Sequence, residues 1–121
     1  MKVFALVLLF PWLFSVGCGR NAGPPEPLPV EQLPAALQQA FSKAKPDIKE
    51  VADKVVALVE AKDYSKAFWA MQHLSTMAGL TKDQNSVTTR GLLTLNGLLQ
   101  SAQTQGDQKA AQTLKTFRGN R

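Results

Sequence analysis

Few side chains in this 121-residue sequence could carry out chemistry, because it contains one histidine, His73, and one cysteine, Cys18. A transition-metal site needs several histidine or cysteine ligands, and a disulfide framework needs pairs of cysteines. The composition therefore predicts neither a transition-metal site nor a disulfide. His73 is expected to be an ordinary residue at the surface or boundary of a helix.

The nine acidic residues could in principle supply a general acid–base pair. Four of them alternate with Lys49 and Lys54 along one segment: Asp47, Glu50, Asp53 and Glu60. This alternation favours a salt-bridged face in solvent. Asp63 and Asp107 are predicted helix caps, and Asp83 lies in a predicted first turn, where the helix dipole favours negative charge. We expect no catalytic residues, no metal or other cofactor, and no small-molecule substrate. The protein is therefore predicted not to be an enzyme.

The only cysteine follows an apolar N-terminal segment. Residues 1–17 contain 13 apolar residues and one charged side chain, Lys2. A membrane-spanning helix needs about 20 consecutive apolar residues, so this segment is more typical of a secretory signal peptide. Ser15-Val16-Gly17-Cys18 resembles the lipobox of bacterial lipoprotein precursors, although the residue at position 15 is commonly Leu in that family. The alternative is an ordinary secreted protein with a chance cysteine.

The lipoprotein resemblance implies a definite location. In that family the cysteine thiol receives a diacylglyceryl group, the chain is cut just before it, and the mature protein carries three acyl chains such as palmitate. Cys18 would then be the lipidation site, and no free thiol would remain to pair with His73. Gly19 stands where family members retained in the inner membrane often have Asp. The resemblance therefore implies a lipid anchor in the outer membrane, facing the periplasm.

A proline-rich stretch follows the cysteine and contains Pro24, Pro25, Pro27, Pro29 and Pro34. Proline lacks an amide donor and favours extended backbone, so this stretch is expected to be a semi-rigid linker. The predicted organisation is a signal peptide over 1–17, the lipidated cysteine and linker over 18–34, and a helical domain over 35–121.

The domain is predicted to be all-α, since apolar residues recur at three- and four-residue steps and no stretch alternates as a half-buried strand would. The expected helices are 35–45, 46–61, 63–76, 82–104 and 107–118. In the fourth helix the expected apolar positions are Val87, Leu92, Leu95, Leu98, Leu99 and Ala102. Thr81 and Gln84 match a capping box at its start.

Two helical hairpins are expected, with turns 44 residues apart at Asp63 and Asp107. The segment from Lys62 to Phe68, KDYSKAF, resembles the turn of tetratricopeptide repeats, in which Asp caps the second helix and Ala allows close helix packing. Gly106-Asp107 with Ala111 is similar. The spacing exceeds the family's repeat of about 34 residues. Both a small tetratricopeptide-like hairpin array and a plain four- to five-helix bundle remain open.

The charge distribution bears on partners. Residues 77–121 carry six Lys or Arg against two Asp, without interleaved stacking aromatics, so nucleic acid is not an expected partner. Residues 91–106 contain no ionisable side chain. Leu93 lies off the main apolar stripe of its helix, which indicates either central burial in the bundle or a partner groove. Trp69 also lies off its stripe. Leu93 and Trp69 are therefore the candidate contacts for a protein partner.

These observations predict a membrane-anchored periplasmic lipoprotein whose helical body acts as a non-enzymatic protein-binding or scaffold module. The alternative is a structural envelope lipoprotein that associates with the cell wall. The C-terminal sequence Arg118-Gly119-Asn120-Arg121 lacks the terminal Lys by which the major murein lipoprotein is joined covalently, so such association would be non-covalent.

Overall fold

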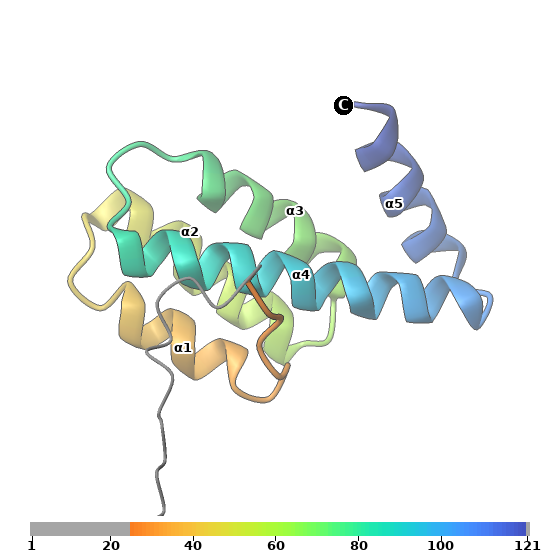
Figure 1. Ribbon diagram of the computed structural model, residues 1–121, viewed down its shortest axis with the longest axis horizontal. Coiled ribbons are helices and arrows are strands. Elements are labelled where there is room, and N and C mark those ends of the chain that lie inside the picture. Colours follow the sequence, from red (N-terminus) through yellow and green to blue (C-terminus); the bar gives the residue numbers. More distant parts are fainter. Residues whose placement is uncertain (1–24, 121) are drawn as a thin grey trace, which may run out of the picture.

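The computed structural model describes residues 25–120, which form five helices and no strand. The all-α prediction is therefore confirmed. The helices are α1 (Leu33–Ala40), α2 (Pro46–Glu60), α3 (Tyr64–Thr76), α4 (Lys82–Thr104) and α5 (Gln108–Gly119) (Figure 1).

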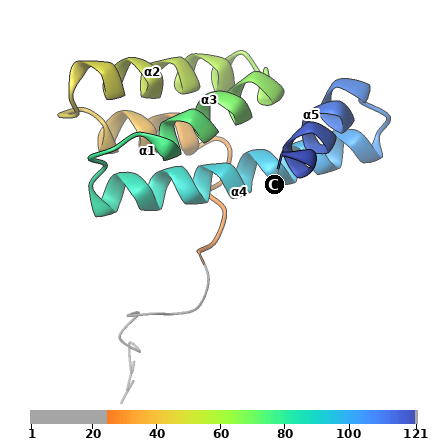
Figure 2. The ribbon, with the colours of Figure 1, turned by 90° about the horizontal axis from the view of Figure 1, so that it is seen from above.

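The first four helices surround one apolar core. Contacts run from α1 to α2, from α2 to α3, from α3 to α4 and from α4 back to α1, whereas α2 and α4 do not touch within the described residues. This ring of contacts is that of a four-helix bundle, with α2 and α4 across from each other (Figure 2). The largest fully buried side chains include Phe41, Phe68, Leu33, Leu37, Met71, Leu74 and Leu95.

The long helix α4 extends beyond the ring, and α5 folds back against this extension (Figures 1 and 2). Helix α5 packs mainly against α4 and meets α3 at fewer points, where Lys109 and Phe117 reach Asp63 and Phe68. Ala110 and Leu114 bury the inner face of α5, and Phe117 is half-buried. The second hairpin therefore projects from the bundle and depends mainly on α4 for its position.

Helix α1 differs from its predicted bounds of 35–45. It starts at Leu33 because Pro34 fits the first turn of a helix, where an amide donor is not needed. It ends at Ala40 because the chain must reverse towards α2, and the buried side chain of Phe41 anchors that turn. Pro46 then starts α2, as predicted.

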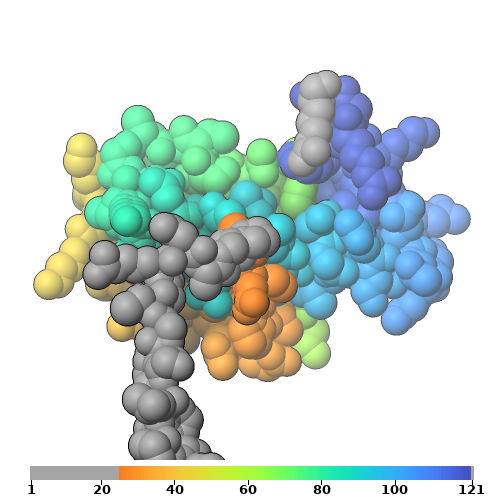
Figure 3. All heavy atoms as spheres, in the orientation of Figure 1, coloured from red at the N-terminus to blue at the C-terminus, as the bar shows by residue number. Residues whose placement is uncertain are grey.

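Residues 25–32, which the sequence analysis assigned to the linker, lie against α4 and are called the strap below (Figure 3, orange). Leu28 is only 8% exposed and joins the core. Thr94 donates a hydrogen bond to the carbonyl of Leu28, and Arg90 donates one from Nε to the carbonyl of Glu26 at 2.9 Å. This part of the predicted linker is thus packed on the helical body.

The buried face of α4 is more polar than its leucines suggested. It consists of Gln84, Thr88, Gly91, Thr94, Leu95 and Leu99, whereas the expected positions Val87, Leu92, Leu98 and Ala102 are only partly buried. The buried polar atoms are all hydrogen-bonded within the described residues. Gln84 completes the predicted capping box with Thr81 and also donates from Nε2 to the carbonyl of Ala40. One side chain therefore closes α4 and links it to the end of α1.

The two glycines within α4 meet opposite surroundings. A Cβ added at Gly91 would lie 2.6 Å from Met71 Cε and 3.0 Å from Leu33 Cδ1, so α4 comes close to α3 and α1 at this point. A Cβ added at Gly97 would meet nothing within 4 Å. A side chain at position 91 would therefore crowd Met71 and Leu33, whereas one at position 97 would crowd nothing.

The two hairpin turns have the same backbone geometry. Lys62 and Gly106 both adopt positive φ, at 58° and 93°. The following residues, Asp63 and Asp107, donate their amides to carbonyls five residues earlier, on Leu58 and Ala102. This is the Schellman termination of a helix. Each aspartate then accepts an amide hydrogen bond three residues ahead, as the cap predictions required.

The glycine pair provides a test of the packing around α4. Gly97→Ala should stabilise the protein by about 1 kcal/mol through helix propensity alone. Gly91→Ala should gain less than this, because the added Cβ would displace the buried ends of Met71 and Leu33, and crowding of a packed core offsets the same propensity gain. Urea unfolding followed by circular dichroism measures both. Equal changes in the free energy of unfolding for the two variants would contradict the close approach at Gly91.

Candidate protein-binding surface

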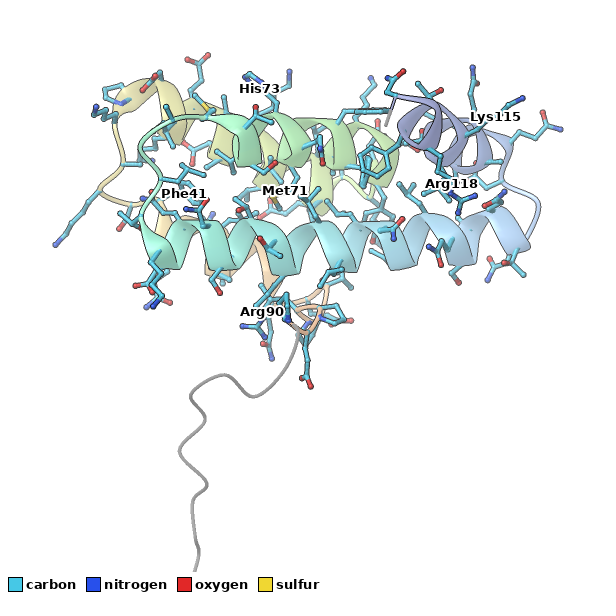
Figure 4. All side chains as sticks on the ribbon, turned by 45° about the horizontal axis from the view of Figure 1, so that its top comes forward. Phe41, Met71, His73, Arg90, Lys115 and Arg118 are labelled. Atoms are coloured by element: carbon cyan, nitrogen blue, oxygen red, sulfur yellow. The ribbon has the colours of Figure 1, made fainter. Side chains whose placement is uncertain are left out.

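The only histidine lies on the outer surface of α3, pointing away from α4 (Figure 4). His73 lines a groove of about 750 Å³ between α2 and α3 together with Glu50, Lys54 and Lys66. Within residues 25–120, no hydrogen bond or ion pair joins His73 to a carboxylate, and no group of three potential metal ligands occurs. His73 thus occupies the exposed helical position that its spacing predicted.

The carboxylates on α2 form the solvent face that their alternation with lysine indicated. Lys49 and Asp53 form an ion pair at 3.2 Å, four residues apart, and both side chains are about half exposed. Exposed pairs of this kind contribute little to stability, with typical values of about 0–1 kcal/mol. They hold the helix surface in solvent and do not assemble a reactive centre.

Asp63 connects the two hairpins through its carboxylate. Its Oδ1 accepts the backbone amide of Lys66 at 3.2 Å, which caps α3, and lies 3.5 Å from Nζ of Lys109 on α5. The amide hydrogen bond from Lys66 is the main cause that lowers the pKa of Asp63 below its ordinary value of 3.8. Partial burial opposes this effect, and the positive charges of Lys109 and Lys66 reinforce it. The Asp63 carboxylate therefore links the start of α3 to Lys109 of α5.

Three aromatic side chains meet where α5 approaches α3. Phe68 lies edge-on to Phe117 at a centroid distance of 5.0 Å and to Trp69 at 5.5 Å. Trp69 and Phe117 are 6.2 Å apart. Such edge-to-face pairs contribute about 0.5–1.5 kcal/mol each beyond their burial. Because Phe68 is buried and its two neighbours are not, the cluster begins in the core and reaches the surface.

A groove lies beside this cluster, bounded by α3, α4 and α5, and we call it the α4 groove. Its volume is about 310 Å³. The lining residues are Phe68, Gln72, Thr89, Leu92, Leu93, Asn96 and Phe117. None of these side chains ionises. An apolar group entering the α4 groove would therefore displace water without removing any charge from solvent.

The structure places both candidate contact residues at the surface. Trp69 is 37% exposed and Leu93 is 38% exposed, and they are the large exposed hydrophobic residues of the described chain. Central burial in the bundle is therefore wrong as the explanation for Leu93. The two residues do not line one groove: Leu93 belongs to the α4 groove, whereas Trp69 borders the groove between α2 and α3. Phe68 and Phe117 lie between them.

The sequence pattern predicts the wall of the α4 groove formed by α4, but not the walls formed by α3 and α5. The uncharged run 91–106 marked the α4 wall, which includes Leu92 and Leu93. The spacing of Phe68 and Phe117 from the other apolar residues predicts only that they lie on the apolar faces of their helices. Their local periodicity contained no signal for the groove, because it arises from the angle at which α5 meets α3.

Two cations lie away from this groove, on the outer side of the second hairpin. Lys115 and Arg118 line a surface depression between α4 and α5 with Gln103, Gln108, Ala111 and Gln112 (Figure 4). The described residues contain no ion pair for either cation. These charges keep the projecting hairpin solvated.

The lowered pKa of Asp63 predicts that the free energy of unfolding depends on pH. A carboxylate whose pKa is lowered by folding stabilises the native state above its ordinary pKa, and this stabilisation is lost as the pH falls through the folded value. Asparagine caps helices as well as aspartate, so Asp63→Asn removes mainly the charge. The variant should be less stable than the parent at neutral pH, and the difference should shrink as the pH falls below 3.8.

Urea unfolding at a series of pH values measures this difference. Lys109→Gln, which breaks the link to α5 but leaves the cap, should reproduce only part of it. A difference that does not change with pH would show that the charge of Asp63 has no stabilising role.

Cys18 and the lipobox-like tetrapeptide lie outside the described residues, and within the described part no helix is long and apolar enough to cross a membrane. In comparisons with known proteins, no family model, no curated protein and no solved structure matches this chain. The lipoprotein and tetratricopeptide-like resemblances therefore stay predictions. Among the described surfaces, the α4 groove is the candidate binding site.

Proposed function

We propose that this protein is a lipid-anchored periplasmic module of the bacterial envelope that binds another protein through the α4 groove and carries out no catalysis. The observation that carries this proposal is the uncharged groove with a partly exposed leucine on its rim. The tetrapeptide ending at Cys18 supports the lipid anchor, and its residues resemble a lipobox.

A protein partner fits the groove better than a small molecule does. Small-molecule sites combine an apolar lining with a few polar groups that converge on the ligand. The polar residues of the α4 groove are Thr89 and Asn96 on α4 and Gln72 on α3, and no charged side chain lines the groove, so a charged ligand would find no opposite charge there. The apolar face of an amphipathic helix, which inserts side chains at three- and four-residue steps, suits a groove of this kind.

The α4 groove is too small to form a complete protein–protein interface by itself. A stable, specific interface buries about 1,200–2,000 Å² in total, more than this groove can supply alone. A few central residues usually carry most of the binding energy, and aromatic side chains are frequent among them. We therefore assign Leu93, Phe117 and Leu92 to the centre of the interface. Trp69 would lie at its edge, beyond Phe68.

The lipid anchor is tested by intact mass spectrometry of the protein extracted from bacterial membranes. The mature chain should begin at Cys18 and carry the added mass of the diacylglyceryl and amide-linked acyl groups. Cys18→Ala should abolish this processing and leave the leader attached. Recovery of the parent protein with its leader intact, or with an unmodified Cys18, would contradict the proposed anchor.

The binding surface is tested by site-specific photo-crosslinking in living cells. A photoreactive residue at position 93 should form one discrete protein adduct, whereas the same residue at the exposed position 57 on α2 should not. Leu93→Asp should weaken the interaction at least about tenfold, or 1.4 kcal/mol, because it puts a charge into an apolar contact. Gln100→Asp is the matched control on α4, since residue 100 is exposed and lies outside the groove.

Equal crosslinking from positions 93 and 57 would overturn the proposal. Absence of a protein adduct, combined with sedimentation of the protein with purified cell-wall sacculi, would instead favour the structural alternative.

A further inference from the structure

The strap shortens the part of the chain that separates the body from its proposed lipid anchor. Arg90 and Thr94 of α4 donate hydrogen bonds to the strap carbonyls of Glu26 and Leu28, and the Leu28 side chain is buried in the core. Its prolines also restrict the strap before it docks, which lowers the entropic cost of fixing it. The body therefore holds the chain from about residue 25 onwards, well before the start of α1.

The length of the remaining chain sets how far the body can lie from the membrane. Cys18 and Pro25 are seven residues apart, and an extended chain spans at most about 3.3–3.6 Å per residue, so the tether reaches about 25 Å at most. A linker free up to Pro34 would reach about 55 Å. Docking of the strap thus more than halves the range within which the body can move.

The docked strap also selects which side of the body is near the anchor. In Figure 4, Arg90 and the start of the strap lie on one side of α4, and α3 and α5 lie on the other side. Helix α2 lies across the bundle from α4 and does not contact it. For helices about 10 Å apart at the corners of a square, this diagonal is about 14 Å. The tether therefore begins on the strap side of α4, and α2 lies on the opposite side of the bundle.

We propose that the strap orients the body, with the strap side of α4 facing the lipid surface and α2 facing away. This inference rests on the proposed anchor at Cys18. Leu93 is three residues from Arg90 and lies beside it on α4, so the α4 groove begins one row of side chains away from the strap. The groove is thereby held close to the bilayer, and the partner it selects is a protein embedded in or attached to the same membrane.

The orientation can be measured on the mature chain, beginning at Cys18, with a lipid maleimide coupled to the thiol. Attachment then does not depend on processing in the cell, so failure of the orientation and failure of the lipoprotein proposal are distinguishable. Trp69 is the only tryptophan after the leader. In a Trp69→Phe background, Ser86→Trp reports from the exposed surface of α4, and Ala57→Trp reports from the exposed surface of α2.

Energy transfer to a headgroup-labelled acceptor in neutral phosphatidylcholine vesicles should be at least about twofold greater from position 86 than from position 57, given the diagonal of the bundle. Replacing Leu28→Ser, Arg90→Gln and Thr94→Val together should release the strap, because this removes its buried apolar side chain and the two hydrogen bonds from α4, and should reduce this ratio towards one. Thr116→Val with Arg118→Gln is the matched control on α5, where both side chains are exposed, and should leave the ratio unchanged.

Circular dichroism establishes that each variant remains helical. Equal transfer from positions 86 and 57 in the protein with an intact strap would overturn the proposal. A ratio that is unchanged after strap release would also overturn it, because the orientation would then have another cause.

Discussion

The close approach of α4 to α3 and α1 at Gly91 is the constraint on which the arrangement depends. A helix of 23 residues is longer than its neighbours in the bundle, and at Gly91 the side chains of Met71 from α3 and Leu33 from α1 pack directly against it. Gln84 secures the same helix to the end of α1 through the carbonyl of Ala40. Because these contacts hold its first half, the second half of α4 extends beyond the bundle as a fixed support for α5.

The α4 groove is a consequence of that extension. Helix α5 packs against α4 by Leu114 and Ala110 and reaches α3 through the aromatic contact between Phe117 and Phe68. This crossing leaves Leu92 and Leu93 uncovered between the three helices. A groove formed by packed helices needs little ordering when a partner binds. The loss of conformational entropy that opposes binding is therefore small.

The strap connects the helical bundle to the chain that leads to the proposed lipid anchor. The strap belongs to the proline-rich stretch that was predicted to be a semi-rigid linker. It is fixed by one buried leucine and two side-chain hydrogen bonds from α4. The same helix therefore holds the chain that leads to the proposed anchor and forms a wall of the proposed binding groove. In such an arrangement the docked strap sets an upper limit on the distance between the proposed anchor and the groove.

Local sequence patterns determined the helical class, the caps at Asp63, Thr81 and Asp107, and all helix bounds within two residues except the end of α1. Those features depend on periodicity and on hydrogen bonds within a few residues, which the sequence records directly. The polar buried face of α4, the docking of Leu28 and the walls of the groove formed by Phe68 and Phe117 required the tertiary structure. They depend on which distant segments meet and at what angle, and the packing of the whole core decides this.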